Sequence, residues 1–136
     1  VYGDGEQKRC FSYIDDCLSC MIPMLDQENL NKQIINIGPD EEFVTVNKVV
    51  EICSNITGSN LEPIHMADRP QEVKHATCSA DKARKLLNYE TKVNLNQGIK
   101  QTYEYIKKRG TRDFDYRLSI EIDNDLTPKT WKNKEI

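Results

Sequence analysis

Hydrophobic residues recur every three or four positions in four stretches of the chain, and this spacing predicts four helices. One of the two longer helices begins at Thr45, whose hydroxyl can accept a hydrogen bond from a free amide of the first turn, and it ends before Gly58. The other begins after Asn94 and ends before Gly110. In both cases the sequence supplies a capping side chain at the start and a glycine at the end.

Two shorter helices are also predicted. Asp15 or Asp16 can cap the first of them, and Pro23 lies inside its apolar stripe and should shorten or kink it. Ser79 can cap another helix, which runs to Leu87.

Alternation of residue types predicts several short strands. Residues 1–5 and 8–14 are separated by a glycine-rich turn, so the simplest interpretation is a hairpin. Further strands are expected at residues 33–37, 61–66 and 114–122. Pro70 forbids a central strand between residues 67 and 74, which indicates a loop there.

About four short strands and four helices in mixed order predict an α/β fold, more closely a mixed α+β lobe with a small sheet. A length of 136 residues suits one such lobe and is short for a complete dinucleotide-dependent enzyme. We expect the lobe to occupy residues 1–110 and residues 111–136 to form a weakly anchored C-terminal extension. The chain opens on an apolar and aromatic pair rather than on Met, so we interpret it as a fragment of a longer protein.

Composition excludes several classes of function. A net charge of −3 argues against nucleic acid as a partner, and no apolar run approaches the roughly 20 residues of a membrane span. We therefore expect a cytoplasmic protein. Five cysteines without framework-like spacing disfavour a disulfide scaffold, and Cys17 and Cys20 form a C-x-x-C pair within a predicted helix, so no metal site is expected. His65 and His75 have no partner at metal-ligand spacing.

Five segments of the chain, in order and spacing, resemble one protein family. They are Val1-Tyr2-Gly3-Asp4-Gly5-Glu6-Gln7-Lys8-Arg9, Phe11-Ser12-Tyr13-Ile14-Asp15-Asp16, Asn36-Ile37-Gly38, Arg69-Pro70-Gln71-Glu72-Val73, and the run from Ala80 to Leu87 that ends at Tyr89. Together they resemble the C-terminal, substrate-binding portion of extended short-chain dehydrogenases/reductases of the NDP-sugar epimerase/dehydratase type, over about residues 1–108. The tail from Thr127 to Lys132 resembles that of an epimerase-like subset.

The resemblance implies a binding site for the nucleotide part of an NDP-sugar, and a UDP-sugar is the expected ligand. In the family, arginines of the G-x-Q-x-R and R-P-x-E/D motifs hold the diphosphate, and these positions are Arg9 and Arg69 here. Arginine suits that task because its planar guanidinium can donate two parallel hydrogen bonds to phosphate oxygens. Glu72 would accept the ribose hydroxyls, and Tyr2 would lie near the base.

Two further positions are candidates for the same ligand. Thr45 stands at the head of a predicted helix, where its side chain and adjacent amide can meet a diphosphate. Gln7 is a lesser candidate. The alternative for each residue is structural: Arg9 can pair with Asp15 or Asp16, and Thr45 can simply cap its helix.

The resemblance also implies NAD in the full-length parent, but none bound by this chain. The parent's N-terminal Rossmann half would carry the Gly-rich fingerprint and the Tyr-x-x-x-Lys pair, neither of which is assigned here, so no catalytic residue is expected in this chain. Tyr103 and Lys107 match Tyr-x-x-x-Lys in spacing, but Tyr103 lies on the stripe with Ile99 and Ile106 and is interpreted as core packing.

Several functions therefore remain open. The first is part of an NAD-dependent, UDP-glucose 4-epimerase-like isomerase whose parent is a homodimer. The second is part of an NDP-sugar 4,6-dehydratase or a UDP-glucuronate decarboxylase, which would use the same nucleotide site. Hypotheses of other classes are a stand-alone, non-catalytic sugar-nucleotide-binding or interaction module and a small domain with a cysteine-based metal or redox site.

Overall fold

The fold was analysed in a computed structural model that describes residues 1–60, 62–112 and 123–134. The sheet consists of three strands of two residues each: β1 (Lys8–Arg9), β2 (Val44–Thr45) and β3 (His75–Ala76). The larger helices are α1 (Ile14–Met21), α2 (Val46–Thr57), α3 (Asp81–Leu87) and α4 (Leu95–Arg109). Two 3-10 turns, η1 (Pro23–Asp26) and η2 (Glu28–Leu30), follow α1, and the short α5 (Lys129–Lys132) lies in the tail. The predicted mixed α/β class with a small sheet is confirmed.

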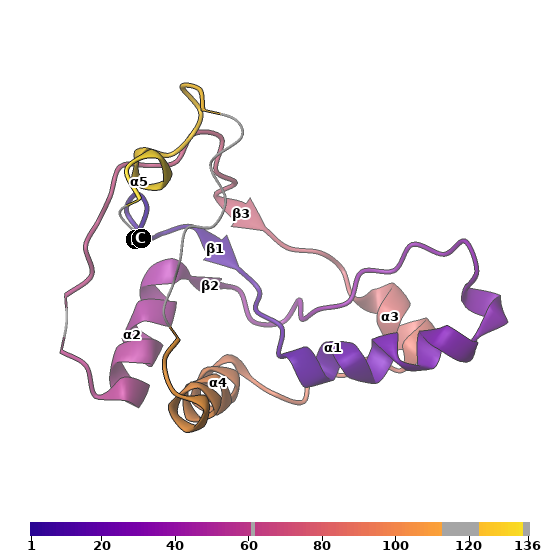
Figure 1. Cartoon of the computed structure of the whole chain (residues 1–136). Coiled ribbons are helices and arrows are strands. Elements are labelled where there is room, and N and C mark those ends of the chain that lie inside the picture. The colour runs from indigo at the N-terminus through magenta and orange to yellow at the C-terminus, as the bar shows by residue number, and fades with distance from the viewer. Residues whose placement is uncertain (61, 113–122, 135–136) are drawn as a thin grey trace.

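Strand β1 lies in the middle of the sheet, between β2 and β3 (Figure 1). It pairs with β2 antiparallel, with Lys8 opposite Thr45, and with β3 parallel, with Arg9 opposite Ala76. The predicted hairpin within residues 1–14 is therefore wrong, because β1 takes its partners from segments more than thirty residues away. Tyr2 instead forms an isolated parallel bridge with Met66.

The caps of the longer helices are confirmed. The Thr45 hydroxyl accepts from the Lys48 amide at 3.1 Å, and Gly58 takes the left-handed conformation, with φ 70°, that ends α2. Asn94 and Gln97 form a reciprocal capping box at the start of α4.

Helices α1 and α3 also form, with caps that differ from those predicted. Tyr13 rather than an aspartate stands at the N-terminus of α1, and the Asp16 carboxylate accepts from the amides of Lys92 and Val93 at 3.1 and 3.0 Å. Helix α1 ends at Met21 before Pro23, as expected for a proline in the stripe. The N-cap of α3 is Ala80.

The predicted strand at 33–37 does not form in the described structure. Ile34 is 86% exposed, and no described strand lies beside it to take its backbone hydrogen bonds. In the 61–66 stretch, of which residue 61 is not described, only Met66 takes part in a bridge. The strand predicted at 114–122 lies outside the described residues.

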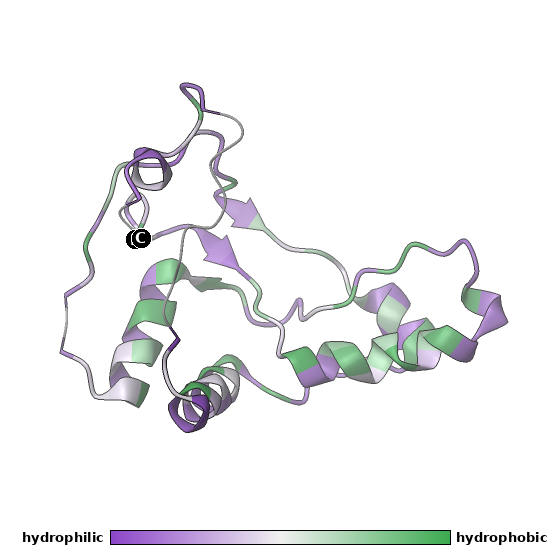
Figure 2. Ribbon diagram, viewed as in Figure 1, coloured by the Kyte–Doolittle hydropathy of each residue, from purple (hydrophilic) through white to green (hydrophobic). Residues whose placement is uncertain are grey.

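Buried side chains gather in an arm formed by α1, α3 and the turns between them (Figure 1). The cluster consists of Cys20, Leu30, Ala80, Ala83, Leu87 and Tyr89. Hydrophobic colouring also recurs along α1 and the turn that follows it (Figure 2). Ile22 and Leu25 are 61% and 83% exposed. The arm therefore packs on one side and leaves a hydrophobic surface on the other.

Helices α2 and α4 pack against each other at the opposite end of the molecule. An apolar cavity of about 360 Å³ lies between them and the segment 11–13. Tyr103 lines this cavity with Ile99 and Ile106, half-buried, and the Lys107 ammonium lies 5.8 Å from the centre of its ring. This position agrees with a packing role for Tyr103.

Candidate functional site

Arg9 has its guanidinium fixed by the backbone of the neighbouring loop. Its Nη1 donates to the Lys8 carbonyl at 2.7 Å and to the Lys74 carbonyl at 3.3 Å, and its Nη2 donates to the Val73 carbonyl at 2.5 Å. Nη2 also donates to Oε1 of Gln7 at 3.2 Å. Because four acceptors fix one side chain, Arg9 holds a single orientation beside the loop that carries Arg69.

Arg69 and Glu72 form a two-point ion pair within that loop. Nε of Arg69 donates to Oε2 of Glu72 at 2.6 Å, and Nη2 donates to Oε1 at 2.5 Å. Pro70 fixes one backbone angle between them, and Gln71 adopts a positive φ of 59°, which turns the chain so that Glu72 faces back toward Arg69. The R-P-x-E spacing thus places Arg69 and Glu72 so that they form an ion pair within the loop.

Both arginines converge on the same carboxylate. Nη2 of Arg9 lies 3.8 Å from Oε1 of Glu72, so one anion stands between two guanidiniums. The Glu72 side chain is only 11% exposed, whereas the Arg9 and Arg69 side chains are 26% and 34% exposed. The hydrogen bonds from Arg69 hold the pKa of Glu72 below its usual range and raise the pKa of Arg69. The three groups carry one excess positive charge on their accessible side.

Tyr2 extends the cluster by covering Arg69. The Arg69 Cζ atom lies 4.6 Å from the centre of the Tyr2 ring, which is cation-π geometry. Tyr2 reaches this place because its backbone is bridged to Met66, three residues before Arg69.

The structure brings five of the six predicted residues into one contiguous group: Tyr2, Gln7, Arg9, Arg69 and Glu72. Thr45 joins it only through the backbone, as the register partner of Lys8, and its hydroxyl is engaged in capping α2. The alternative pairing of Arg9 with Asp15 or Asp16 is not observed. A ligand-binding role for the six residues stays a prediction.

Sequence reasoning missed the contribution of the tail. The Tyr2 hydroxyl forms a hydrogen bond with the hydroxyl of Thr130, and Thr130 is 5% exposed. No pattern in the polar tail distinguishes Thr130 from its neighbours, because a single buried threonine leaves no periodic signal.

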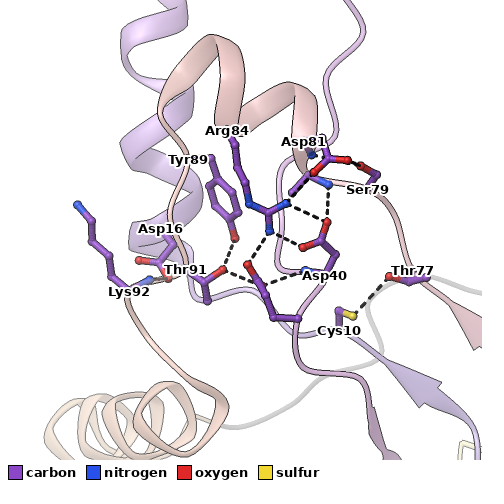
Figure 3. A network of polar contacts seen from close by, with 12 residues as sticks. Cys10, Asp16, Asp40, Thr77, Ser79, Asp81, Arg84, Tyr89, Thr91 and Lys92 are labelled. Atoms are coloured by element: carbon purple, nitrogen blue, oxygen red, sulfur yellow. Dashed lines mark hydrogen bonds and ion pairs between the residues drawn. The ribbon is translucent and has the colours of Figure 1, made fainter.

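A second polar cluster surrounds Arg84 on α3 (Figure 3). Arg84 hydrogen-bonds with Asp40, with Glu41 at 2.6 Å and with Asp81 at 3.2 Å. The hydrogen bond from Arg84 lowers the pKa of Asp40 to about 2. Three carboxylates around one guanidinium leave two excess negative charges, so this cluster repels anions and acts as a brace between α3 and the turn at Asp40. Of the two clusters, that of Arg9 and Arg69 is the one suited to a diphosphate.

The described residues do not fit the pyrophosphate of NAD. A dinucleotide site requires a glycine-rich turn between a strand and a helix, so that helix amides meet the phosphates. In the described part of the chain, Gly3 and Gly5 are the only closely spaced glycines, and they lead into β1 rather than into a helix. Among those residues, no three His, Cys, Asp or Glu side chains are arranged so that they could hold a metal ion.

Comparison with known proteins places the chain in a family. The GDP-mannose 4,6 dehydratase family profile matches residues 1–102. A UDP-glucuronate 4-epimerase of Thermodesulfobacterium geofontis is 32% identical over 108 residues, which are 79% of this chain and 33% of that protein. A UDP-N-acetyl-alpha-D-glucosaminuronate decarboxylase of Bacillus cytotoxicus is 28% identical, over 79% of this chain and 35% of its own length.

A solved structure agrees in fold as well as in sequence. UDP-glucuronic acid 4-epimerase from Bacillus cereus, in complex with UDP-glucuronic acid and NAD, superposes with a TM-score of 0.74 at 32% identity, over 81% of this chain and 35% of that one. The chain belongs to the extended short-chain dehydrogenase/reductase family of NDP-sugar epimerases and dehydratases. It spans about a third of the length of the relatives that it matches. Among the described helices, none has the length and apolar character needed to cross a bilayer.

Proposed function

We propose that this chain is the substrate-binding part of an NAD-dependent nucleotide-sugar epimerase, similar to UDP-glucose 4-epimerase, and that it binds the nucleotide end of a UDP-sugar or another NDP-sugar. The observation that carries the proposal is the convergence of Arg9 and Arg69 on Glu72. In the proposed parent, NAD and the reacting groups belong to an N-terminal Rossmann half.

The two guanidiniums supply what a diphosphate requires. A diphosphate carries about two negative charges and presents oxygens to parallel donors. Arg9 is held in place by backbone carbonyls before any ligand binds, so it loses little conformational freedom on binding. Arg69 is more exposed, and among the described residues its ion-pair partner is Glu72. Arg69 contributes on the order of 1.5–3 kcal/mol through charge-assisted hydrogen bonds in a partly dry site. Four of the five N–H donors of Arg9 are taken by protein acceptors, so Arg9 acts on the diphosphate mainly through its charge.

The neighbouring side chains match the rest of the nucleotide. Glu72 can accept hydrogen bonds from two ribose hydroxyls once the diphosphate shares its arginines, and Tyr2 offers an aromatic surface for the base. Gln7 orients Arg9 through its amide oxygen. Thr45 lies at the start of α2, next to β1, and forms a further polar border of the proposed site.

A nucleotide-binding site of this kind can serve more than one reaction. Binding energy from the remote nucleotide positions the sugar at the reacting centre and does not depend on the chemistry that follows. A parent that is an NDP-sugar dehydratase or a UDP-glucuronate decarboxylase is the second candidate, supported by the decarboxylase among the relatives. A cytoplasmic location, a homodimeric parent and UDP-glucose as the particular substrate are parts of the first proposal.

The test is a titration of the full chain with UDP and with inorganic pyrophosphate by isothermal calorimetry. Arg69→Ala is expected to weaken both ligands at least tenfold, since it removes a donor pair to the phosphates. Arg9→Lys retains the charge but cannot reproduce the four hydrogen bonds, and it is expected to weaken both as well.

Arg109→Ala, an exposed arginine at the end of α4, is the matched control and should leave both affinities within twofold. Melting temperatures establish that each variant is folded. Unchanged titrations for Arg69→Ala and Arg9→Lys would refute the proposed function.

A further inference from the structure

The tail of the chain closes one side of a small cavity next to Arg69. The cavity has a volume of about 230 Å³. Tyr2 and residues 66–70 form one wall, and Asp125 with residues 127–130 form the other. The two walls come from opposite ends of the sequence, so a defined contact must hold them together.

That contact is the hydrogen bond between the hydroxyls of Tyr2 and Thr130. Thr130 is buried, whereas Lys129 and Trp131 on either side of it are exposed, so within α5 it is Thr130 that packs against the rest of the described residues. The Arg69 guanidinium lies over the Tyr2 ring. Thr130 therefore fixes the ring of Tyr2 from its hydroxyl end, while Arg69 fixes it from one face.

The tail wall also has a conformation of its own. The Asn124 side chain accepts from the Leu126 amide at 2.8 Å, and the Asn124 amide donates to the Thr127 hydroxyl at 3.1 Å. The Lys132 ammonium lies 2.5 Å from the Asp123 carboxylate. These local contacts order the segment, so it can present a fixed surface at low entropic cost.

The size and position of the cavity define what fits it. Complete ligand sites measure about 300–1,000 Å³, so a cavity of about 230 Å³ takes one part of a nucleotide-sugar rather than the whole. It borders Arg69, so that part must lie within about one ribose of the diphosphate. The cavity is lined by the aromatic ring of Tyr2, by Pro70 and Pro128 and by the Thr127 hydroxyl, together with Asp68 and Asp125, a combination that suits a flat heterocycle with a polar edge.

We infer that residues 125–130 form the second wall of a nucleobase subsite, and that Thr130 is a positioning residue that acts on the base through Tyr2. The inference rests on the proposed function, since it places the base relative to a diphosphate held by Arg69. On this inference, the tail supplies the part of the nucleotide affinity that comes from contacts with the base.

The chain contains one tryptophan, Trp131, which directly follows Thr130 and reports on this segment. Fluorescence of the full chain, excited at a wavelength at which the base does not absorb, is recorded during titration with UDP and with inorganic pyrophosphate. Saturating UDP is expected to change the emission of Trp131, and saturating pyrophosphate is expected to leave it unchanged. Identical changes in Trp131 emission with the two ligands would overturn the inference, so this test needs the wild-type chain alone.

A set of threonine variants tests the positioning role. Thr130→Val removes the partner of Tyr2 and should weaken UDP at least fivefold while pyrophosphate binding stays within twofold. Thr130→Ser keeps the hydroxyl and should restore UDP binding. Thr111→Val, at an exposed position after α4, is the matched control and should change neither affinity.

The outcomes separate the inference from the proposed function. If pyrophosphate binding depends on Arg69 but Thr130→Val weakens UDP and pyrophosphate equally, the subsite is refuted and the proposed function stands. The same conclusion follows if Thr130→Val changes neither affinity. Failure of the wild-type chain to bind either ligand refutes both.

Discussion

Glu72 plays two opposing roles in the proposed site, and replacing it by glutamine separates them. Its carboxylate pairs with Arg69 and lies near Arg9, so it competes with an incoming diphosphate. In the nucleotide complex it is proposed to accept the ribose hydroxyls. Glu72→Gln keeps the shape of the side chain and removes the charge, so a ligand without ribose and a ligand with ribose should respond differently.

The magnitude follows from the geometry. Exposed ion pairs contribute about 0–1 kcal/mol, and the two-point contact with a carboxylate that is 11% exposed places Arg69–Glu72 near the upper end. Release of this pair is expected to strengthen pyrophosphate binding by about 1 kcal/mol, which corresponds to about fivefold. UDP gains the same amount but loses charged hydrogen bonds to ribose, each contributing about 1.5–3 kcal/mol. The ratio of UDP affinity to pyrophosphate affinity should therefore fall at least tenfold.

Calorimetric titration of the full chain with both ligands at low ionic strength measures this ratio. Glu51→Gln, which breaks the exposed pair with Lys48 on α2, is the matched control and should leave the ratio unchanged. Equal weakening of both ligands by Glu72→Gln would mean that Glu72 only supports the loop. That result would refute its assignment to the ribose.

Two further predictions concern stability and assembly. The folded-state pKa of Asp40 is lowered to about 2 by Arg84, so its contribution to stability is present above its ordinary pKa near 4 and is lost as the pH falls through about 2. Asp40→Asn should accordingly lower the melting temperature at pH 7 and have a much smaller effect at pH 2, where the carboxyl is half protonated in the folded chain, and a constant difference across that range would contradict the assignment. The exposed apolar side of α1 and η1 should drive self-association of the chain, and the double variant Ile22→Glu, Leu25→Glu should shift it toward monomer in sedimentation velocity, whereas a monomeric wild type would contradict this.

Features encoded within a few neighbouring residues could be predicted from the sequence. The caps at Thr45 and Asn94 and the stop at Gly58 depend on contacts over three or four positions, and the structure has all of them. The loop at residues 67–74 follows in the same way from Pro70. The arginines and Glu72 were found by motif order, and the structure shows that they are also close in space.

Features that depend on distant partners could not be predicted. Alternation in residues 8–14 indicates an extended chain but does not identify its neighbours, which are Thr45 and His75 rather than residues 1–5. The apolar run 33–37 has the composition of a buried strand, but composition cannot show whether a second strand is available. Thr130 was missed for a related reason, since its contact lies 128 positions away.

The central position of β1 has a consequence for how the chain should be handled. Lys8 is joined to residues 45 and 75, and Tyr2 to residue 130, so the binding residues meet only after several long loops have closed. A nucleotide held by the proposed site would therefore bind the native chain and not its denatured form, and at 100 times its dissociation constant it would add about 2.7 kcal/mol to the folding free energy. Purification and storage in a saturating nucleotide should slow loss of the protein to precipitation, and a screen of melting temperatures across nucleotides would rank them by affinity.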